Sequence, residues 1–379
     1  MHVVIVSYPL PAAARTPAAL LEQFHSLTGW AEALAAAGAR VTVAQRFHHD
    51  AELQRAGVRY LFVRDGARPL PRAWQIPRRL HRAALAAMPD LVHLQGLIFP
   101  LQTRALRAAL PPRVALAVQH HAGDPPAPNG PRGRLQLALA RLGLAAANGF
   151  LFTCEELAAP WRAAGIVRAG QPVYPVLEAS TALRAPAEPA AQLRGAPALL
   201  WVGRLHPVKD PLTVLEGFAR ALPALPGAVL SMAYGSEELL AAVRERAARP
   251  DLAGRVELLG RLAQPQLAHC YAAADLFVLG SRREGSGYAL IEALACGLPP
   301  AVTAIPAFRA VTGDSVGAHW QPGNAEACAR AITGVVKVGR EAGRAAALQR
   351  FGAALSWEQV GRDAVAAYAD LRGRQCASR

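Results

Sequence analysis

The hydrophobic positions of the chain form short apolar runs, and longer stretches with helical periodicity separate them. In the first half these runs do not alternate with polar residues, which is typical of strands buried on both faces. We expect strands at residues 3–7, 41–45, 58–63, 91–95, 114–119 and 150–153, with helices between them such as residues 20–37 and 132–146. This order predicts a parallel sheet with helices on both faces.

The second half repeats this pattern after an interruption. Residues 179–197 are rich in Ala, Pro, Ser and Thr, a composition typical of a linker. Apolar runs resume at residues 198–203, 229–233, 256–259, 275–279 and 300–303, and a helical period marks residues 357–371. A chain of 379 residues exceeds what one core normally supports. We therefore predict an α/β fold with two doubly wound domains, residues 1–185 and 186–356, and a terminal helical segment, residues 357–379.

Residues 281–297 contain a predicted helix that is almost entirely apolar but includes one carboxylate. From Tyr288 to Cys296 every residue is apolar except Glu292. A helix that is apolar on nearly all sides is buried among its neighbours. Because an unpaired buried carboxylate disfavours folding, Glu292 must find a partner or face a cavity that holds a polar ligand.

The start of this helix is favourable for an anion. Gly285 and Gly287 leave the backbone bare just before the first turn. Backbone N–H groups and the positive end of the helix dipole meet there, which indicates a site for an anion such as phosphate.

A second candidate site follows the strand expected at residues 198–203. Arg204 and Lys209 lie five residues apart in a loop that begins with Gly203 and leads into a helix expected at 212–221. The fork of an arginine and the compact charge of a lysine suit a diphosphate. Solvated loop cations are the alternative, but Lys209 is one of only two lysines in an arginine-rich chain, which favours function.

Together these motifs resemble the retaining GT-B glycosyltransferases of family 4. The resemblance rests on Gly203-Arg204-Leu205 with Lys209, on Glu284 and Glu292 separated by seven residues, and on residues 256–260, 274–278 and 292–299. In the first half it is limited to residues 34–43, residues 89–93 and a strand that ends in histidine. The resemblance implies a GT-B fold, in which two Rossmann-like domains face a central cleft and the last helix crosses back onto the first domain.

The resemblance also implies roles for the residues of the second domain. Arg204 and Lys209 would neutralise the diphosphate of a nucleotide-sugar and stabilise the departing nucleoside diphosphate. Glu284 would bind hydroxyls of the transferred sugar, and Glu292 would accept hydrogen bonds from the ribose hydroxyls. The acceptor would be held mostly by the first domain.

Backbone N–H groups of Gly287, Tyr288 and Ala289 would complete the phosphate site. The family places a histidine beside the donor sugar at the end of a first-domain strand, where this chain has His120 and His121. We favour His121, because its neighbour can turn into the sheet edge. Two loop histidines bonded to backbone are the other interpretation.

The chain departs from the family in the first domain. Family members often carry a Gly-Gly pair soon after the first strand, whereas this chain has residues 9–12, Pro-Leu-Pro-Ala, and Gly29 lies too far along to replace the pair. In the second domain Arg309 stands where a glycine-rich segment is common, as a further anion contact or as a surface charge.

Composition limits the partners. The net charge of +14 comes almost wholly from arginine, which either a GC-rich coding bias or an acidic partner explains. The five scattered cysteines indicate reduced thiols rather than a disulfide framework or a zinc site. No Asp-x-Asp motif occurs, so we expect no metal and no cofactor beyond the nucleoside-diphosphate sugar as co-substrate.

Location is predicted from the same sequence. No secretory leader precedes residues 2–7 and no run of eighteen apolar residues occurs, so we expect a cytoplasmic protein. Basic and apolar residues mingle at 72–82, which suits either a peripheral contact with the inner membrane face or a solvated helix interrupted by Pro77. Nucleic-acid binding is not expected, because no basic stripe joins a recognised module.

The functional prediction is a retaining glycosyltransferase that moves a hexose-type sugar from a nucleoside-diphosphate sugar to a small-molecule, glycan or lipid-linked acceptor. The alternatives are a GT-B-like sugar-nucleotide epimerase or hydrolase, and a non-catalytic sugar-nucleotide-binding protein.

Overall fold

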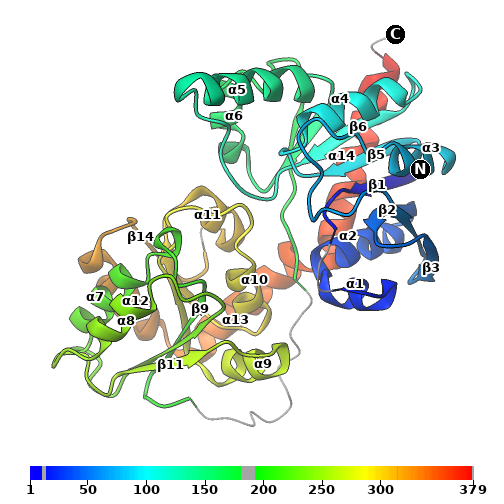
Figure 1. Ribbon diagram of the computed structural model, residues 1–379. Helices are drawn as coiled ribbons and strands as arrows, with labels where there is room; N and C mark the ends of the chain where they lie inside the picture. The colour runs from blue at the N-terminus through cyan, green and yellow to red at the C-terminus, as the bar shows by residue number, and fades with distance from the viewer. Residues whose placement is uncertain (11–13, 181–192, 314, 378–379) are drawn as a thin grey trace. The chain divides into compact units, whose positions relative to one another are not determined.

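The computed structural model describes residues 1–10, 14–180, 193–313 and 315–377 (Figure 1). The chain forms two compact units: Met1–Ala179 with Trp357–Arg379, and Ser180–Ser356. Most of the linker predicted at 179–197 lies outside the described residues. None of the described helices combines the length and the apolar character needed to cross a membrane.

The first unit contains a sheet with the strand order β3-β4-β2-β1-β5-β6-β7-β8. All six strands predicted for this half are present. Every neighbouring pair is parallel except β3 with β4, where the structure adds an antiparallel edge that the sequence pattern did not predict. The strands are β1 (His2–Ser7), β2 (Arg40–Phe47), β3 (Ala51–Arg55), β4 (Val58–Arg64), β5 (Leu91–Gln95), β6 (Ala115–Gln119), β7 (Gly149–Phe152) and β8 (Val173–Pro175).

Both faces of this sheet are covered, as the unalternating apolar runs predicted. Successive residues of β1 enter different cores, Val3 and Ile5 one cluster and Val4 and Val6 the other. The covering helices are α1 (Pro17–Gln23), α2 (His25–Ala36), α3 (Arg78–Ala86), α4 (Pro100–Ala109), α5 (Gly130–Leu144), α6 (Ala159–Ala163) and α14 (Trp357–Ala377), with a 3₁₀ turn η1 (Glu155–Leu157). The single helix predicted at 20–37 is wrong, because Phe24 (φ −102°, ψ 64°) leaves the helical conformation between α1 and α2.

Helix α14 (red in Figure 1) packs against α2 within this unit. Trp30 of α2 donates a hydrogen bond to the hydroxyl of Tyr368, 3.1 Å away. A Cβ on Gly29 would lie 2.3 Å from the Trp357 ring, and a Cβ on Gly361 would lie 2.4 Å from the Ala33 carbonyl oxygen. Gly29 therefore allows the close approach of two helices.

The second unit contains a sheet with the strand order β11-β10-β9-β12-β13-β14, and all neighbours are parallel. The strands are β9 (Ala198–Gly203), β10 (Val229–Tyr234), β11 (Val256–Gly260), β12 (Leu276–Leu279), β13 (Pro300–Thr303) and β14 (Ala318–Trp320). The first five were predicted. The order reverses between β9 and β12, and in sheets of this type ligands bind beyond the carboxyl ends of the strands at that point.

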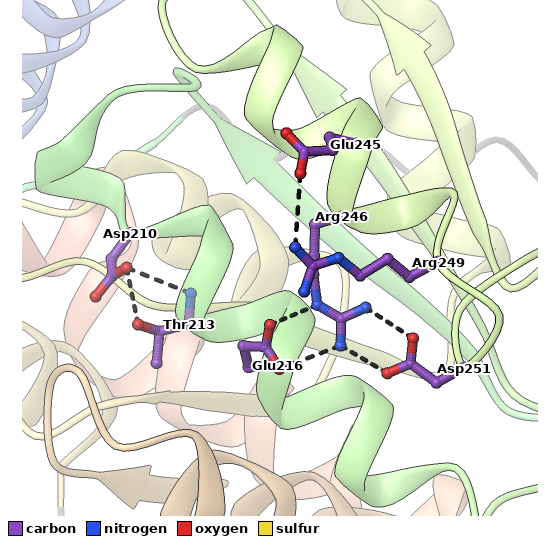
Figure 2. A network of polar contacts seen from close by, with 7 residues as sticks. All are labelled: Asp210, Thr213, Glu216, Glu245, Arg246, Arg249 and Asp251. Carbon is purple, nitrogen blue, oxygen red and sulfur yellow. Dashed lines mark hydrogen bonds and ion pairs between the residues drawn. The ribbon is translucent and has the colours of Figure 1, made fainter.

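The helices of the second unit are α7 (Pro211–Ala221), α8 (Leu240–Ala247), α9 (Gln264–Ala273), α10 (Tyr288–Ala295), α11 (Pro306–Thr312), α12 (Ala325–Val338) and α13 (Arg340–Arg350), with a 3₁₀ turn η2 (Pro207–Lys209) and a π-helical turn η3 (Phe351–Leu355). Figure 2 shows how α7 is held at its middle and at its first turn. Buried Arg246 of α8 bonds the carboxylates of Glu216 and Asp251. At the start of α7 Asp210 accepts hydrogen bonds from Thr213. The loop that precedes α7 is therefore attached to a fixed helix.

Candidate functional site

The two motif-bearing loops of the second unit lie on either side of the point where the strand order reverses. One loop follows β9 and contains Arg204 and Lys209, and the other follows β12 and contains Glu284. A backbone hydrogen bond of 2.8 Å from the Arg282 N–H to the Val208 carbonyl joins them. Residues that are far apart in sequence thus meet at the carboxyl edge of the sheet.

Lys209 and Glu284 form an ion pair with each other. The Lys209 ammonium contacts Glu284 Oε1, and only 14% and 13% of the two side chains are exposed. The hydroxyl of buried Ser281 donates to the same oxygen at 2.7 Å. Within the described part of the chain, Glu284 Oε2 accepts no hydrogen bond. The arrangement holds a lysine charge in place and leaves one carboxylate oxygen open.

Asp210 fixes the backbone just after Lys209. Its φ of +45° is left-handed, and its carboxylate both caps α7 through Thr213 and pairs with the Arg282 guanidinium at 2.8 Å. Two loops are therefore tied together by side chains as well as by backbone. This arrangement restricts where the Lys209 ammonium can lie.

Arg204 is not held in place as Lys209 is, although the sequence assigned both residues to the diphosphate. Its side chain is exposed, and across residues 1–10, 14–180, 193–313 and 315–377 no hydrogen bond or ion pair holds the guanidinium. Arg204 directly follows the last residue of β9 and is therefore at the carboxyl edge of the sheet. No contact with a described residue fixes the direction of its side chain.

The start of α10 is shaped by Gly287. This residue is left-handed (φ +75°), and a Cβ there would lie 2.9 Å from the Phe308 ring. As the N-cap residue it has no side chain to cover the first turn, which Tyr288 begins. Next to it, the buried hydroxyl of Ser286 finds no hydrogen-bond partner in the described residues. A buried polar atom of this kind is costly unless a ligand or water satisfies it.

Glu292 has one partner that the sequence did not indicate. The hydroxyl of buried Tyr271, on α9, donates to Glu292 Oε2 at 3.1 Å and lies 3.0 Å from the Ala289 carbonyl oxygen. Burial raises the pKa of Glu292 from 4.5 to about 7, although the Tyr271 hydrogen bond acts in the opposite direction. The carboxylate therefore remains expensive to ionise, as its apolar helix predicted.

The two histidines at the end of β6 have different surroundings. His120 is buried and stacks on Phe152, with 4.8 Å between the ring centroids. Its Nε2 lies 3.1 Å from the Gly123 carbonyl oxygen. His121 keeps 34% of its side chain exposed, and its Nδ1 lies 3.3 Å from Glu178 Oε1. Of the two, His121 has the more exposed ring.

Glu178 is a residue that sequence reasoning missed. It is buried, and its Oε1 accepts a hydrogen bond of 2.9 Å from the Gln119 amide as well as facing His121. A carboxylate beside Nδ1 favours the tautomer that carries its proton there and leaves Nε2 as an acceptor. No sequence signal marked Glu178, which directly precedes the interval interpreted as a linker.

The other residues considered from the sequence have surroundings that assign them no part in this site. Pro9 and Leu10 are tied by their backbone to Gln45 and Pro69, whereas residues 11–13 lie outside the described residues. Arg309 is exposed in the last turn of α11. The five cysteines are free thiols, four of them buried. Among the described residues, no group of three or more His, Cys, Asp or Glu side chains could hold a metal ion.

Two family models match the sequence, one to each unit. The model for glycosyl transferases group 1 matches residues 189–347, and the model for the glycosyl transferase 4-like domain matches residues 25–177. The D-inositol 3-phosphate glycosyltransferase of Geodermatophilus obscurus is 33% identical over 178 residues, which is 45% of this chain and 39% of that protein. The chain thus spans about two fifths of the length of that relative.

Solved structures share the fold across nearly the whole chain. The sucrose-phosphate synthase of Thermosynechococcus elongatus has a TM-score of 0.69 at 19% identity, covering 98% of this chain and 99% of that one. HepE of Anabaena, in complex with UDP, has a TM-score of 0.65 at 15% identity, covering 98% of this chain and 100% of that one. With family models matched across both units, this chain belongs to the group 1 glycosyltransferases, the family 4 type, and has their GT-B fold.

Proposed function

We propose that the protein is a retaining glycosyltransferase that moves a hexose-type sugar from a nucleoside-diphosphate sugar to an acceptor hydroxyl. One observation carries the proposal: the loops after β9 and β12 bring a lysine, an open carboxylate oxygen and a helix start with a glycine N-cap to the carboxyl edge of one sheet. Membership of the group 1 family and the UDP bound to HepE support a nucleotide-sugar donor.

The proposal assigns the diphosphate to Lys209, to Arg204 and to the start of α10. Lys209 supplies a fixed charge that opposes the charge developing on the departing diphosphate. Arg204, which has no partner in the described residues, can turn toward the phosphates. The unsatisfied hydroxyl of Ser286 and the first-turn N–H groups of residues 287–289 supply hydrogen bonds to phosphate oxygens.

The sugar and the ribose are assigned to the two glutamates. Glu284 Oε2 is open and would accept hydrogen bonds from hydroxyls of the transferred sugar. Glu292 would accept them from the ribose, which relieves the cost of its buried charge.

His121 is assigned to the reacting sugar, with Glu178 holding its ring. No described side chain of the second-unit site stands out as a covalent nucleophile, because Glu284 is assigned to hydroxyls of the transferred sugar and Glu292 to the ribose. We therefore propose that the acceptor attacks from the face that the leaving group departs, with the departing phosphate as the base, so that the anomeric configuration is retained.

Metal independence is part of the proposal, because Lys209 and Arg204 supply positive charge where a metal would otherwise bind the diphosphate. We also propose a cytoplasmic location, and the five free thiols suit a reducing compartment.

A donor screen tests the proposed function. Thermal unfolding is recorded with a panel of UDP-, GDP- and ADP-sugars, because a ligand that binds the native state raises the midpoint. The donor that does so is then incubated with candidate acceptors and excess chelator, and products are analysed by mass spectrometry and NMR. We expect acceptor-dependent transfer with retained configuration. Donor consumption without acceptor would favour the epimerase or hydrolase, and binding without turnover would favour a non-catalytic protein.

We further propose a peripheral membrane contact at residues 72–82 of the first unit. Residues 72–77 form a loop and α3 begins after Pro77, so the amphipathic helix considered from the sequence is not continuous. Trp74 is 70% exposed with the Arg72 guanidinium 5.4 Å from its ring, and the buried Gln102 amide holds the loop by three backbone carbonyls. A fixed, exposed tryptophan beside cations suits an anionic lipid surface.

Cosedimentation with vesicles tests this contact. We expect binding to vesicles that contain phosphatidylglycerol and a loss of about tenfold to 100-fold in Trp74→Ala, because burying an apolar side chain is worth roughly 1.5–3 kcal/mol. Val338→Ala, at another exposed apolar residue, which belongs to the second unit, is the matched control. Equal binding by both variants would exclude the contact.

A further inference from the structure

A second basic site lies in the first unit, whereas the residues assigned to the donor diphosphate belong to the second unit. A pocket of about 460 Å³ opens beyond the carboxyl ends of the parallel strands β2 and β4 and beside the start of α3. This is the edge at which sheets of this type bind ligands. Its lining consists of His48, Arg64, Asp65, Gly66, Ala67 and Arg79.

Beneath the pocket lies a buried cation with incomplete hydrogen bonding. Arg46 of β2 has no exposed surface, and its Nη2 donates to the carbonyls of Arg68 and Pro69. Its Nε and Nη1 have no hydrogen-bond partner in the described residues. A Cβ on Gly66 would lie 3.7 Å from Nη1, so this nitrogen lies against the wall of the pocket.

The charges around the pocket do not cancel. Arg79 is bonded to Asp50 at 2.7 Å, and the Asp65 carboxylate is occupied by backbone N–H groups at the start of α3. Arg64 has an exposed guanidinium that no described residue bonds. Arg46, Arg64 and Arg79 against Asp50 and Asp65 leave one net positive charge, and the fork of Arg64 is open.

We infer that this pocket binds a phosphate monoester group, with Arg64 as its main ligand. The guanidinium fork matches two phosphate oxygens, and the buried Arg46 adds a positive field that little solvent screens. The pocket is open to solvent, and its volume leaves room for a small organic group attached to the phosphate. Resting on the proposed function, the inference makes the acceptor a small phosphorylated molecule whose phosphate is held at β2 and β4.

Binding is measured directly on the full chain, without turnover. Inorganic phosphate and glucose 6-phosphate are titrated by ³¹P NMR into the wild type, Arg64→Ala and Arg59→Ala. Arg59 is the matched control, an exposed arginine of the same strand that pairs with Glu52. We expect both ligands to bind the wild type, the sugar phosphate more tightly, and Arg64→Ala to weaken both by about tenfold or more while Arg59→Ala binds as the wild type does.

Other results overturn the inference. An equal loss in Arg64→Ala and Arg59→Ala would mean attraction to the overall charge of the protein, and no binding by the wild type would mean that the pocket is not an anion site. Equal affinity for phosphate and sugar phosphate would overturn the assignment to an acceptor. UDP binding by Arg64→Ala is recorded in parallel and should be unchanged, so that failure of the donor site and failure of this pocket are separate observations.

Discussion

Replacing Lys209 by alanine is expected to abolish donor binding that calorimetry can detect and to lower turnover by about 10²–10³-fold. The ammonium is held by Glu284 at the carboxyl edge of β9. Its removal takes away a charge assigned to the diphosphate and leaves the Glu284 carboxylate without its cation. The phosphates would then approach an unbalanced negative charge, so the loss exceeds that of one contact.

Calorimetry with the donor found in the screen, or with UDP, measures this effect. Lys337→Ala is the matched control, because it removes the only other lysine of the chain, which is exposed on α12. Circular dichroism should show that both variants are folded. Donor affinity equal in Lys209→Ala and Lys337→Ala would exclude the donor site.

A double variant separates the two parts of the Lys209 effect. If the unbalanced carboxylate contributes, Lys209→Ala with Glu284→Gln should bind UDP more tightly than Lys209→Ala alone, although more weakly than the wild type. Binding of UDP is the appropriate measurement, because UDP lacks the sugar whose hydroxyls Glu284 is assigned to bind. An additive loss would show that the ion pair has no part in phosphate binding.

The central strands of both sheets, and the positions of the loops that carry the motifs, could be predicted from the sequence. Long apolar runs without alternation fix strands that are buried on both faces, and the loops that follow β9 and β12 are then brought to one edge by topology alone. Strands that lack such a run were missed. β3 is largely exposed and paired only at one side, and β8 and β14 are three residues long.

The partners of the site residues could not be predicted, because each comes from a distant part of the chain. Tyr271 reaches Glu292 from α9, and Glu178 reaches His121 from beyond β8. Composition showed that Glu292 needed a partner, but only packing decides which helix supplies the hydroxyl. The same holds for Lys209 and Glu284, which the sequence assigned to different parts of the donor and which the structure pairs.

Replacing Glu292 by glutamine is expected to have opposite effects on stability and on function. Burial raises the pKa of this carboxyl from 4.5 to about 7 in the folded protein. Between these values the folded state binds more protons than the unfolded state, so the free energy of unfolding falls as pH rises through this range. Above the folded pKa the full cost of about 3 kcal/mol is present, and a neutral glutamine avoids it.

Urea unfolding at about pH 5 and about pH 8 measures the stability effect. Glu292→Gln should exceed the wild type by up to about 3 kcal/mol at the higher pH and by much less at the lower one. Glu245→Gln, at an exposed glutamate of α8 in the same unit, should differ little from the wild type at either pH. Equal stability of Glu292→Gln and the wild type at the higher pH would show that the carboxylate is not destabilising.

Donor affinity should change in the opposite direction, because the ribose hydroxyls donate hydrogen bonds to the ionised carboxylate of Glu292. Wild-type affinity should weaken as pH falls below about 7, where the Glu292 carboxyl takes up a proton. Glu292→Gln should bind donor about 100-fold more weakly at neutral pH, below calorimetric detection for a weak donor, since a hydrogen bond to a charged group is worth roughly 1.5–3 kcal/mol. The variant should also lose the pH dependence. A more stable protein that keeps the wild-type affinity would show that Glu292 is a buried structural carboxylate and that the ribose lies elsewhere.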